Sequence, residues 1–288
     1  MELEKFNVAK SRKTGQDRMV SWLYGHTVGR TFLRVLISPW FSKAGGRLLS
    51  TRLSAFAVKP FVKANNIELT GCKKQKFQSF NDFFTRELQP EMRPVEQEEK
   101  AWISPCDARL TVYPVSMEGR FEVKGTLYTA TELLKNEKLA KRYDGGWLWL
   151  YRLSVDDYHR YIYPCSGKKS LNVQIPGIFH TVNPIAAEAE PIYKTNTREY
   201  CVIRTKELGT VLMMEVGAML VGKIENREPG PSCVNRGQEK GNFAFGGSTI
   251  IVLSQAGCAA PEEKILKNSS AGFETKVRMG EKVGYRPE

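Results

Sequence analysis

Residues 242–253 read Asn-Phe-Ala-Phe-Gly-Gly-Ser-Thr-Ile-Ile-Val-Leu. Two glycines precede Ser248 and an apolar, β-branched run follows it, a pattern that predicts a tight turn entering a buried strand. The residue two positions after Ser248 is not glycine, so the nucleophile elbow of an α/β-hydrolase does not fit. The Gly-Lys-Ser/Thr ending of a phosphate-binding loop is also missing. The stretch therefore indicates a glycine turn into a strand and neither of these two catalytic loops.

The Gly-Gly-Ser order also permits a backbone reaction at Ser248. The glycines allow positive φ values and leave the Gly247 carbonyl open to the neighbouring hydroxyl. Attack by the Ser248 Oγ would turn the amide into an ester, and elimination across Cα–Cβ would then break the chain. The new N-terminus would be dehydroalanine, which hydrolyses to a pyruvoyl group that forms imines with amines and accepts electrons. On these residues alone, a simple glycine turn is the open alternative.

Two further segments carry candidate acid–base residues. Residues 156–160 read Asp-Asp-Tyr-His-Arg, and His159 could act as a general acid or base near neutral pH. Residues 104–107 read Ser-Pro-Cys-Asp, where Asp107 could orient and polarise a base. Each has a plain alternative: a surface histidine beside two carboxylates, and an aspartate that closes a turn.

The predicted secondary structure changes from helical to β-rich near Trp102. Before it, Ser79 and Asp82 have the spacing of an N-terminal cap for a short helix that ends before Pro90. After it, short β-rich runs are separated by Gly and Pro, without the regular strand–helix alternation of a doubly wound nucleotide fold. We expect one helix over 129–142. We expect strands at about 109–115, 120–125, 146–155, 170–175, 199–205, 210–216, 219–225 and 248–253.

The basic charge is concentrated near the N-terminus. Residues 1–64 hold 12 Lys and Arg and 3 Asp and Glu, a net charge of +9, whereas residues 65–288 hold 31 and 28, a net charge of +3. The first segment is also rich in apolar and indole side chains, but basic residues interrupt every run before the ~20 residues that span a bilayer. Its opening residues do not form a secretory signal. Amphipathic helices lying on an anionic lipid surface fit this pattern, and helices that simply cap the main domain are the alternative.

These patterns predict an α+β fold class, with an N-terminal helical, membrane-facing segment followed by a β-rich domain. We place a basic amphipathic helical segment at 1–72 and the β-rich domain at 73–288. The net charge of +12 suggests an anionic partner, and because no nucleic-acid-binding motif accompanies it, nucleic acid is not expected. Three histidines nearly exclude zinc hydrolase chemistry, and six scattered cysteines are typical of reduced thiols in a cytoplasmic protein.

Taken together, these segments resemble the phosphatidylserine decarboxylase family, in its shorter bacterial type. The resemblance covers roughly residues 20–285, and its most specific parts are FNDFFTR and the glycine–serine element at this spacing. The matching segments are, in chain order, 79–88 (SFNDFFTREL) with 93–94 (RP), 104–107 (SPCD), 157–160 (DYHR), 214–218 (MEVGA) with 221–222 (VG), and 240–249 (KGNFAFGGST).

The resemblance implies a self-processing carboxy-lyase that is made as a zymogen. Cleavage would fall between Gly247 and Ser248, giving a β chain, 1–247, and an α chain, 248–288, of 41 residues that starts with a pyruvoyl group derived from Ser248. The family converts phosphatidylserine to phosphatidylethanolamine and carbon dioxide through a Schiff base on that covalent pyruvate. Neither pyridoxal phosphate nor a metal is then expected.

The resemblance also assigns roles and partners. Ser248 is the self-cleavage nucleophile and cofactor precursor, and Asp107 is the acidic member of the processing triad. His159 is expected to contact the substrate carboxylate or to protonate the carbanion, and Arg160 is a candidate for substrate binding. The expected partners are phosphatidylserine, an anionic phospholipid membrane on whose cytoplasmic face the protein lies peripherally, the two chains of the protein itself, and a second copy in a homodimer.

One position departs from the family pattern. The motif DYHR is usually followed, after one more residue, by a second histidine that relays between the aspartate and the serine, and here that position is Ile162. Either His159 does both jobs, or His180 takes over the relay, which we favour, or processing is impaired. Two other functions stay open: a relative on the same scaffold that acts on a free amino acid, and an unprocessed, non-catalytic lipid-binding relative in which Ile162 marks lost processing.

Overall fold

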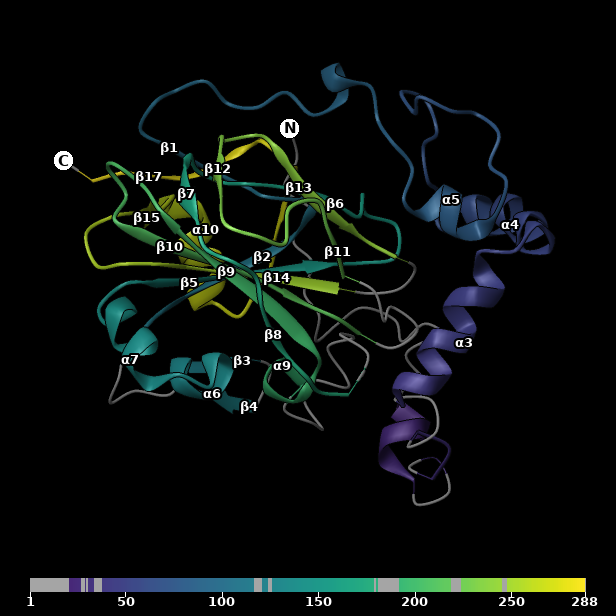
Figure 1. Ribbon diagram of the computed structural model, residues 1–288, viewed down its shortest axis with the longest axis horizontal. Helices are drawn as coiled ribbons and strands as arrows, with labels where there is room; N and C mark the ends of the chain where they lie inside the picture. Colours follow the sequence, from purple (N-terminus) through teal and green to yellow (C-terminus); the bar gives the residue numbers. More distant parts are fainter. Residues whose placement is uncertain are drawn as a thin grey trace.

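The computed structural model describes residues 21–26, 29, 31–33, 38–116, 121–123, 126–178, 180, 192–218, 224–244 and 248–287. In Figure 1 a helical part lies to one side of a β-rich body, and a long segment of chain joins the two. This combination of helices with a β-rich body confirms the α+β fold class. Among the described residues, no helix is both long and apolar enough to cross a bilayer.

The helical part is built around an aromatic cluster. Helix α5 begins where the sequence predicts, because the Ser79 side chain accepts a hydrogen bond from the Asp82 N–H at 3.1 Å. The rings of Phe61 and Phe80 pack edge to face, 5.0 Å apart, so α5 shares one apolar cluster with the helices before it. The elements are α3 (Pro39–Leu49), η1 (Arg52–Ala57), α4 (Val58–Ala64), α5 (Phe80–Phe84) and the turn η2 (Pro90–Met92).

The body is organised by a nine-stranded antiparallel sheet. Its strand order is β12–β7–β9–β10–β14–β5–β2–β16, and β8 also pairs with β9. Strand β14, which begins at Ser248, therefore lies in the interior of the sheet between β10 and β5. The strands are β2 (Ala108–Pro114), β5 (Trp147–Leu153), β7 (Gly167–Lys169), β8 (Val173–Ile175), β9 (Arg198–Arg204), β10 (Thr210–Val216), β12 (Ser232–Val234), β14 (Ser248–Ser254) and β16 (Thr275–Val277).

Both faces of this sheet are covered, which explains why β14 is buried along its whole length. The Ile250 face, which carries Ile250 and Val252, packs against α10 and two three-stranded sheets, β1–β17–β15 and β11–β13–β6. These elements are α10 (Glu263–Ser270), β1 (Ala101–Ile103), β6 (Arg160–Ile162), β11 (Ile224–Asn226), β13 (Glu239–Phe243), β15 (Ala260–Pro261) and β17 (Lys282–Tyr285).

The opposite, Ile251 face carries Ile251 and Leu253 and packs against short helices (Figure 1). These are α6 (Ala130–Leu134), α7 (Glu137–Ala140), η3 (Lys141–Tyr143) and α9 (Ile192–Thr195), with the hairpin of β3 (Phe121–Val123) and β4 (Thr126–Tyr128) nearby. Because apolar side chains cover both faces, the sheet lies at the centre of the core. Polar side chains on its interior strands are therefore shielded from water.

Several sequence expectations are met by these elements and one is wrong. Five of the expected strands are β2, β5, β9, β10 and β14, with ends shifted by at most two residues. Of the strand expected at 219–225, residues 219–223 lie outside the described part of the chain. The continuous helix over 129–142 is wrong, because Lys135 has a left-handed φ of 52° that ends α6. The Asn136 side chain then caps α7 by accepting from the Leu139 N–H at 3.0 Å.

Candidate active site

Ser248 is a buried polar residue at the first position of β14. It lies opposite Leu153 of β5, and it belongs to the Ile250 face because residues i and i+2 of a strand share a face. Within the described part of the chain, its Oγ has no hydrogen-bond partner. Leaving a buried hydroxyl unsatisfied costs about 1–3 kcal/mol, and such groups in a folded protein call for a functional explanation. The preceding Gly246 and Gly247 lie outside the described residues.

His159 is a buried histidine on the connection between β5 and β6. Its Nδ1 lies 2.9 Å from the backbone oxygen of Asp157. A carbonyl oxygen only accepts hydrogen bonds, so Nδ1 carries the proton and Nε2 is the basic nitrogen of the neutral ring. The ring also packs on Phe84 of α5, with centroids 4.0 Å apart. These contacts fix the ring and make Nε2 the atom that takes up a proton.

Two backbone connections bring His159 to the end of the sheet where Ser248 lies. From Leu153, which lies opposite Ser248, the chain reaches His159 six residues later through a tight turn. From Phe243, whose N–H donates to the His159 oxygen at 3.0 Å, four residues lead to Ser248. The serine and the histidine predicted from the sequence are therefore held at the same end of β14.

The same turn buries Asp157, which the sequence indicated only as part of its motif. Its Oδ2 accepts hydrogen bonds from the Ser154 N–H at 2.7 Å and from Arg109 Nη1 at 3.1 Å. Burial raises the pKa of Asp157 to about 6, although Arg109 acts in the opposite direction. A carboxyl group that titrates near neutral pH, two residues from a buried histidine, is typical of acid–base sites.

Asp107 lies in the connection between β1 and β2, where Arg93 holds both of its carboxylate oxygens. The Arg93 Nε lies 2.7 Å from Oδ1 and Nη2 lies 2.5 Å from Oδ2, while the Met279 N–H donates to Oδ1 at 2.9 Å. The same connection reaches β6, because the Ile162 N–H donates to the Pro105 oxygen at 2.9 Å. Asp107 is therefore next to the strand that follows His159, with an arginine as its ionic partner.

The sequence matches known proteins along most of its length. The sequence profile described as phosphatidylserine decarboxylase matches residues 80–285. Phosphatidylserine decarboxylase proenzyme 2 of Clostridium acetobutylicum is 38% identical over 284 residues, which cover 98% of this chain and 96% of the relative. The phosphatidylserine decarboxylase proenzyme of Clostridium novyi is 40% identical over 280 residues, which cover 95% of both chains. The chain belongs to the phosphatidylserine decarboxylase family.

The departure from the usual phosphatidylserine decarboxylase pattern, Ile162, is part of a small apolar cluster. Its side chain is buried with Ala101 and Ile103, and the partly buried Val95 and Met279 pack against them. Isoleucine carries no group that transfers protons, so the position beside the Asp107 loop contributes packing only.

His180, the expected replacement for the missing relay, faces the N-terminal helical part. Its Nδ1 lies 3.0 Å from the Tyr24 Oη, and the two rings are 5.7 Å apart. Its backbone is held by the Asn196 amide, which also donates to the Gly217 oxygen at 2.8 Å. Gly217 follows the β10 residue that pairs with Thr249, so His180 is connected to the same end of the sheet through the neighbouring strand.

Arg160, which follows His159, links β6 to neighbouring segments through its guanidinium. Its Nη1 lies 2.8 Å and 3.0 Å from the two carboxylate oxygens of Glu239, while Nε and Nη2 donate to the Thr85 oxygen at 3.1 Å and 2.9 Å. These contacts tie β6 to the segment that follows α5. Substrate binding by Arg160 stays a prediction, since its guanidinium already has protein acceptors.

A buried ion pair beside the site was not indicated as functional by the sequence. Lys240 Nζ lies 2.7 Å from Glu215 Oε2, and neither side chain is exposed. Glu215 lies opposite Ile250, so the pair occupies the sheet face to which Ser248 belongs. The only signal was a charged residue within each of two apolar motifs, MEVGA and KGNF, and such residues are equally common on exposed strand faces.

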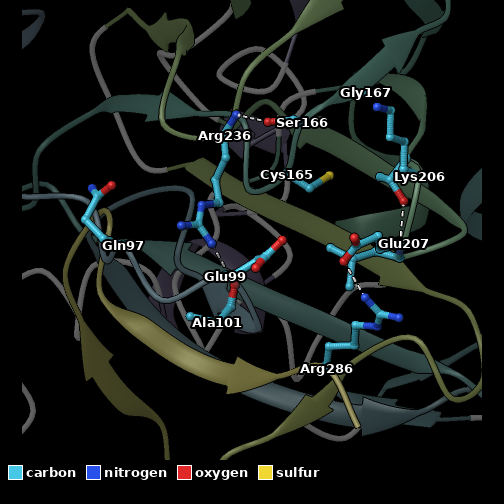
Figure 2. A pocket seen from close by; sticks show the side chains of 12 residues that line it. Gln97, Glu99, Ala101, Cys165, Ser166, Gly167, Lys206, Glu207, Arg236 and Arg286 are labelled. Atoms are coloured by element: carbon cyan, nitrogen blue, oxygen red, sulfur yellow. Dashed lines mark hydrogen bonds and ion pairs between the residues drawn. The ribbon is translucent and has the colours of Figure 1, made fainter. Parts of the chain in front are cut away.

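A hollow lies at the end of the sheet away from Ser248 (Figure 2). Its volume is about 460 Å³, and it opens beside Glu207 and Leu208, in the turn that precedes β10. Arg286 pairs there with Glu207, and Arg236 donates to backbone oxygens that include that of Glu98 at 2.9 Å. The length of β10 separates this hollow from the Ser248 end by roughly 20 Å, so it is not part of the site around Ser248.

Proposed function

We propose that the chain is the precursor of a pyruvoyl-dependent phosphatidylserine decarboxylase, a carboxy-lyase. It cleaves itself into a β chain, 1–247, and an α chain, 248–288, and then converts phosphatidylserine to phosphatidylethanolamine and carbon dioxide. The observation that carries the proposal is the buried Ser248 Oγ, which lacks a hydrogen-bond partner in the described residues and lies at the same end of the sheet as His159. Relatives of similar length that are named proenzymes support it.

Self-cleavage begins when the Ser248 hydroxyl attacks the Gly247 carbonyl. A new C–O bond forms, the C–N bond breaks, and the amine of Ser248 gains the proton that the hydroxyl loses. Removal of the Ser248 α-proton then expels the Gly247 carboxylate and leaves dehydroalanine, which reacts with water to give ammonia and the pyruvoyl group. Each step moves a proton at or near Ser248, so the mechanism needs a base at this end of β14.

We assign that base to His159 Nε2 rather than to His180, which the sequence favoured, because His159 Nδ1 is bound to a carbonyl oxygen and Nε2 is its basic nitrogen. Asp107 lies close enough to Asp157 to act on it electrostatically, and Asp157 is held in the turn that leads to His159. This keeps Asp107 as the acidic member of the processing set. His180 is the second candidate, since Asn196 connects it to the strand next to β14.

The buried end of β14 fits a small ketone at position 248, because an orphaned polar atom already lies there among apolar side chains. A pyruvoyl group there supplies a carbonyl that binds the substrate amine and withdraws the electrons of the bond to carbon dioxide. The protein excludes water from the strand end, and His159 donates a proton to the substrate carbon that loses the carboxylate. The same histidine thus accepts a proton during processing and donates one during turnover.

The N-terminal part supports a peripheral membrane location. Trp40, Leu53 and Phe56 are 75%, 77% and 79% exposed, and the basic Arg47 and Arg52 lie among them on α3 and η1. Large apolar side chains that face water beside arginines are typical of helices lying in an anionic lipid interface, where each basic residue adds about 1 kcal/mol of attraction. We infer that residues 1–72 bring the enzyme to the cytoplasmic face of the membrane and that it acts there as a homodimer.

Different observations argue against the two alternative functions: the exposed apolar surface against a free amino acid as substrate, and the buried Ser248 and His159 against a non-catalytic relative. A decarboxylase of free amino acids needs no exposed apolar helix face, and the relatives are named for a phospholipid substrate. An unprocessed lipid-binding relative would need no unsatisfied buried hydroxyl at the same end of the sheet as a buried histidine. Neither alternative is favoured.

The test is the intact mass of the purified protein under denaturing conditions, with and without a reagent that derivatises ketones. We expect two chains that meet at Gly247 and Ser248, with only the small chain gaining the reagent, and carbon dioxide release from phosphatidylserine. Ser248→Ala is expected to stay a single chain of about 32.6 kDa. Two chains without a ketone, or a wild-type chain that never cleaves, would refute the proposal.

A further inference from the structure

Arg86 is a buried cation without a full set of acceptors. Its side chain belongs to a residue only 6% exposed, and in the described part of the chain Nε and Nη1 have no hydrogen-bond partner. The guanidinium carbon lies 5.2 Å from the centre of the Phe83 ring, and the Cys72 thiol is in contact with it. Burial lowers the pKa of Arg86. A guanidinium placed in this way is costly unless an anion joins it.

Other arginines of the β-rich body differ from Arg86 in this respect. Their guanidinium groups contact carboxylates or backbone oxygens, so their charge is compensated within the protein. The pairs are Arg93 with Asp107, Arg109 with Asp157, Arg152 with Glu274, Arg160 with Glu239, and Arg198 with the oxygens of Glu132, Leu133, Lys194 and Asn196. Arg86 has the Cys72 thiol and the charge of Asp107 nearby, but its Nε and Nη1 lack acceptors in the described chain and are available to an acceptor from outside it.

The position of Arg86 is between the helical part and the candidate active site. It follows α5, whose Phe84 packs on the His159 ring at 4.0 Å. Arg160 donates to the Arg86 oxygen at 3.2 Å, and the Leu88 N–H lies 3.4 Å from the Tyr158 Oη. The segment of Arg86 is therefore fixed against the residues on both sides of His159.

We propose that Arg86 binds the phosphodiester of the lipid substrate and so positions its serine headgroup toward residue 248. This inference rests on the proposed function, because it takes the substrate to be an anionic phospholipid. A guanidinium and a phosphate form short, charge-assisted hydrogen bonds.

Charge development during the reaction favours the phosphodiester over the carboxylate of the substrate. The carboxylate loses its charge as carbon dioxide leaves, so an arginine paired with it would stabilise the ground state more than the transition state and slow the reaction. The phosphodiester keeps its charge throughout. An arginine paired with it lowers KM and leaves kcat nearly unchanged.

The first measurement is binding, which needs no catalysis. Dihexanoyl phosphatidylmethanol, a soluble phosphodiester without amine or carboxylate, is titrated by calorimetry into the purified wild-type protein, Arg86→Gln, Arg86→Lys and the control Arg142→Gln, which changes an exposed arginine on η3. We expect Arg86→Gln to weaken binding roughly 10- to 100-fold. Arg86→Lys, which keeps the charge but loses the planar guanidinium, is expected to weaken binding less than Arg86→Gln, and Arg142→Gln is expected to stay close to wild type. Equal affinity in wild type and in a folded Arg86→Gln protein would overturn the proposal.

A second pair of measurements identifies the anion. Steady-state rates in non-ionic detergent are compared for phosphatidylserine and for O-decanoylserine, which has the amine and carboxylate but no phosphate. We expect Arg86→Gln to raise KM for phosphatidylserine only; an equal loss on both substrates would assign Arg86 to the carboxylate and overturn the phosphodiester. Inorganic phosphate that binds as tightly as the lipid probe would assign the site to free phosphate instead. Absence of any decarboxylation by wild type would refute the proposed function, whereas the titration would still decide the role of Arg86.

Discussion

Replacing Lys240 with methionine is expected to destabilise the fold by about 3–5 kcal/mol. The Lys240 Nζ lies 2.7 Å from Glu215 Oε2 and 2.8 Å from Asn226 Oδ1, and both charged side chains are fully buried. Without the ammonium, the Glu215 carboxylate becomes an uncompensated buried charge, and burial already raises its pKa. At about 2–4 °C per kcal/mol for a chain of roughly this size, Tm should fall by about 6–20 °C.

The double variant Glu215→Leu with Lys240→Met separates the cost of an orphaned charge from the value of the pair. It removes both charges, and Asn226 still has two hydrogen bonds. Its Nδ2 donates to Glu199 Oε1 at 2.6 Å, and its Oδ1 accepts from the Tyr161 Oη at 3.3 Å. We expect it to recover most of the stability lost by the single variant, because an apolar pair of similar volume often replaces a buried ion pair without loss.

The assay is urea unfolding followed by tryptophan fluorescence, with every variant made in the Ser248→Ala background so that all proteins are single chains. Lys267→Met is the matched control, since Lys267 pairs with Glu263 on the surface of α10, where both side chains are more than 70% exposed. Its effect should stay below about 0.5 kcal/mol. A Lys240→Met protein within 1 kcal/mol of its parent, or a double variant no more stable than the single one, would refute the reasoning.

Three further outcomes test the site and the surface. His159→Ala should stop self-cleavage in a denaturing gel time course while His180→Ala still cleaves; the reverse result would assign the relay to His180. Leu53→Ser with Phe56→Ser should weaken binding to anionic vesicles at least about tenfold in flotation, because burying each side chain contributes about 1.5–3 kcal/mol, and unchanged binding would place the membrane surface elsewhere. The raised pKa of Asp157, about 6 when folded against about 3.9 when unfolded, stabilises the protein below pH 4 and is lost as the pH rises through 6. Asp157→Asn should therefore remove up to about 3 kcal/mol of this pH dependence in unfolding titrations between pH 4 and 7.5; an unchanged slope would contradict the assignment.

The central strands could be predicted from the sequence because their signal is local. The run after Ser248 is apolar without alternation, as a strand covered on both faces requires, and β14 is buried along its length. The spacing of Ser79 and Asp82 likewise predicted where α5 begins. The break between α6 and α7 was missed, because Lys135 is a residue that helices readily accept and the apolar Leu133 and Ala140 on its two sides keep a helical i, i+7 spacing.

The site could be predicted only in part, because motifs name residues but not their partners. Ser248 and His159 are brought together by pairing between strands that are distant in sequence, and this follows from the order of the sheet. Asp107 was indicated, but its ion pair with Arg93 was not, since the two lie on separate connections. Arg86 stands out only when every nearby acceptor is known, which no sequence pattern supplies.

Because β14 lies in the interior of the sheet, cleavage before Ser248 would make unfolding of the protein hard to reverse. Cleavage before Ser248 would turn the middle of a continuous sheet into a separate peptide, held by five register positions on β10 and seven on β5. The intact precursor can unfold and refold as one chain, whereas the mature enzyme would have to recapture a diffusing fragment. Its working lifetime would then be governed by how slowly the sheet opens, rather than by the balance between folded and unfolded forms. Folding would come first and cutting second, and a mature enzyme that opened would be lost to dilution.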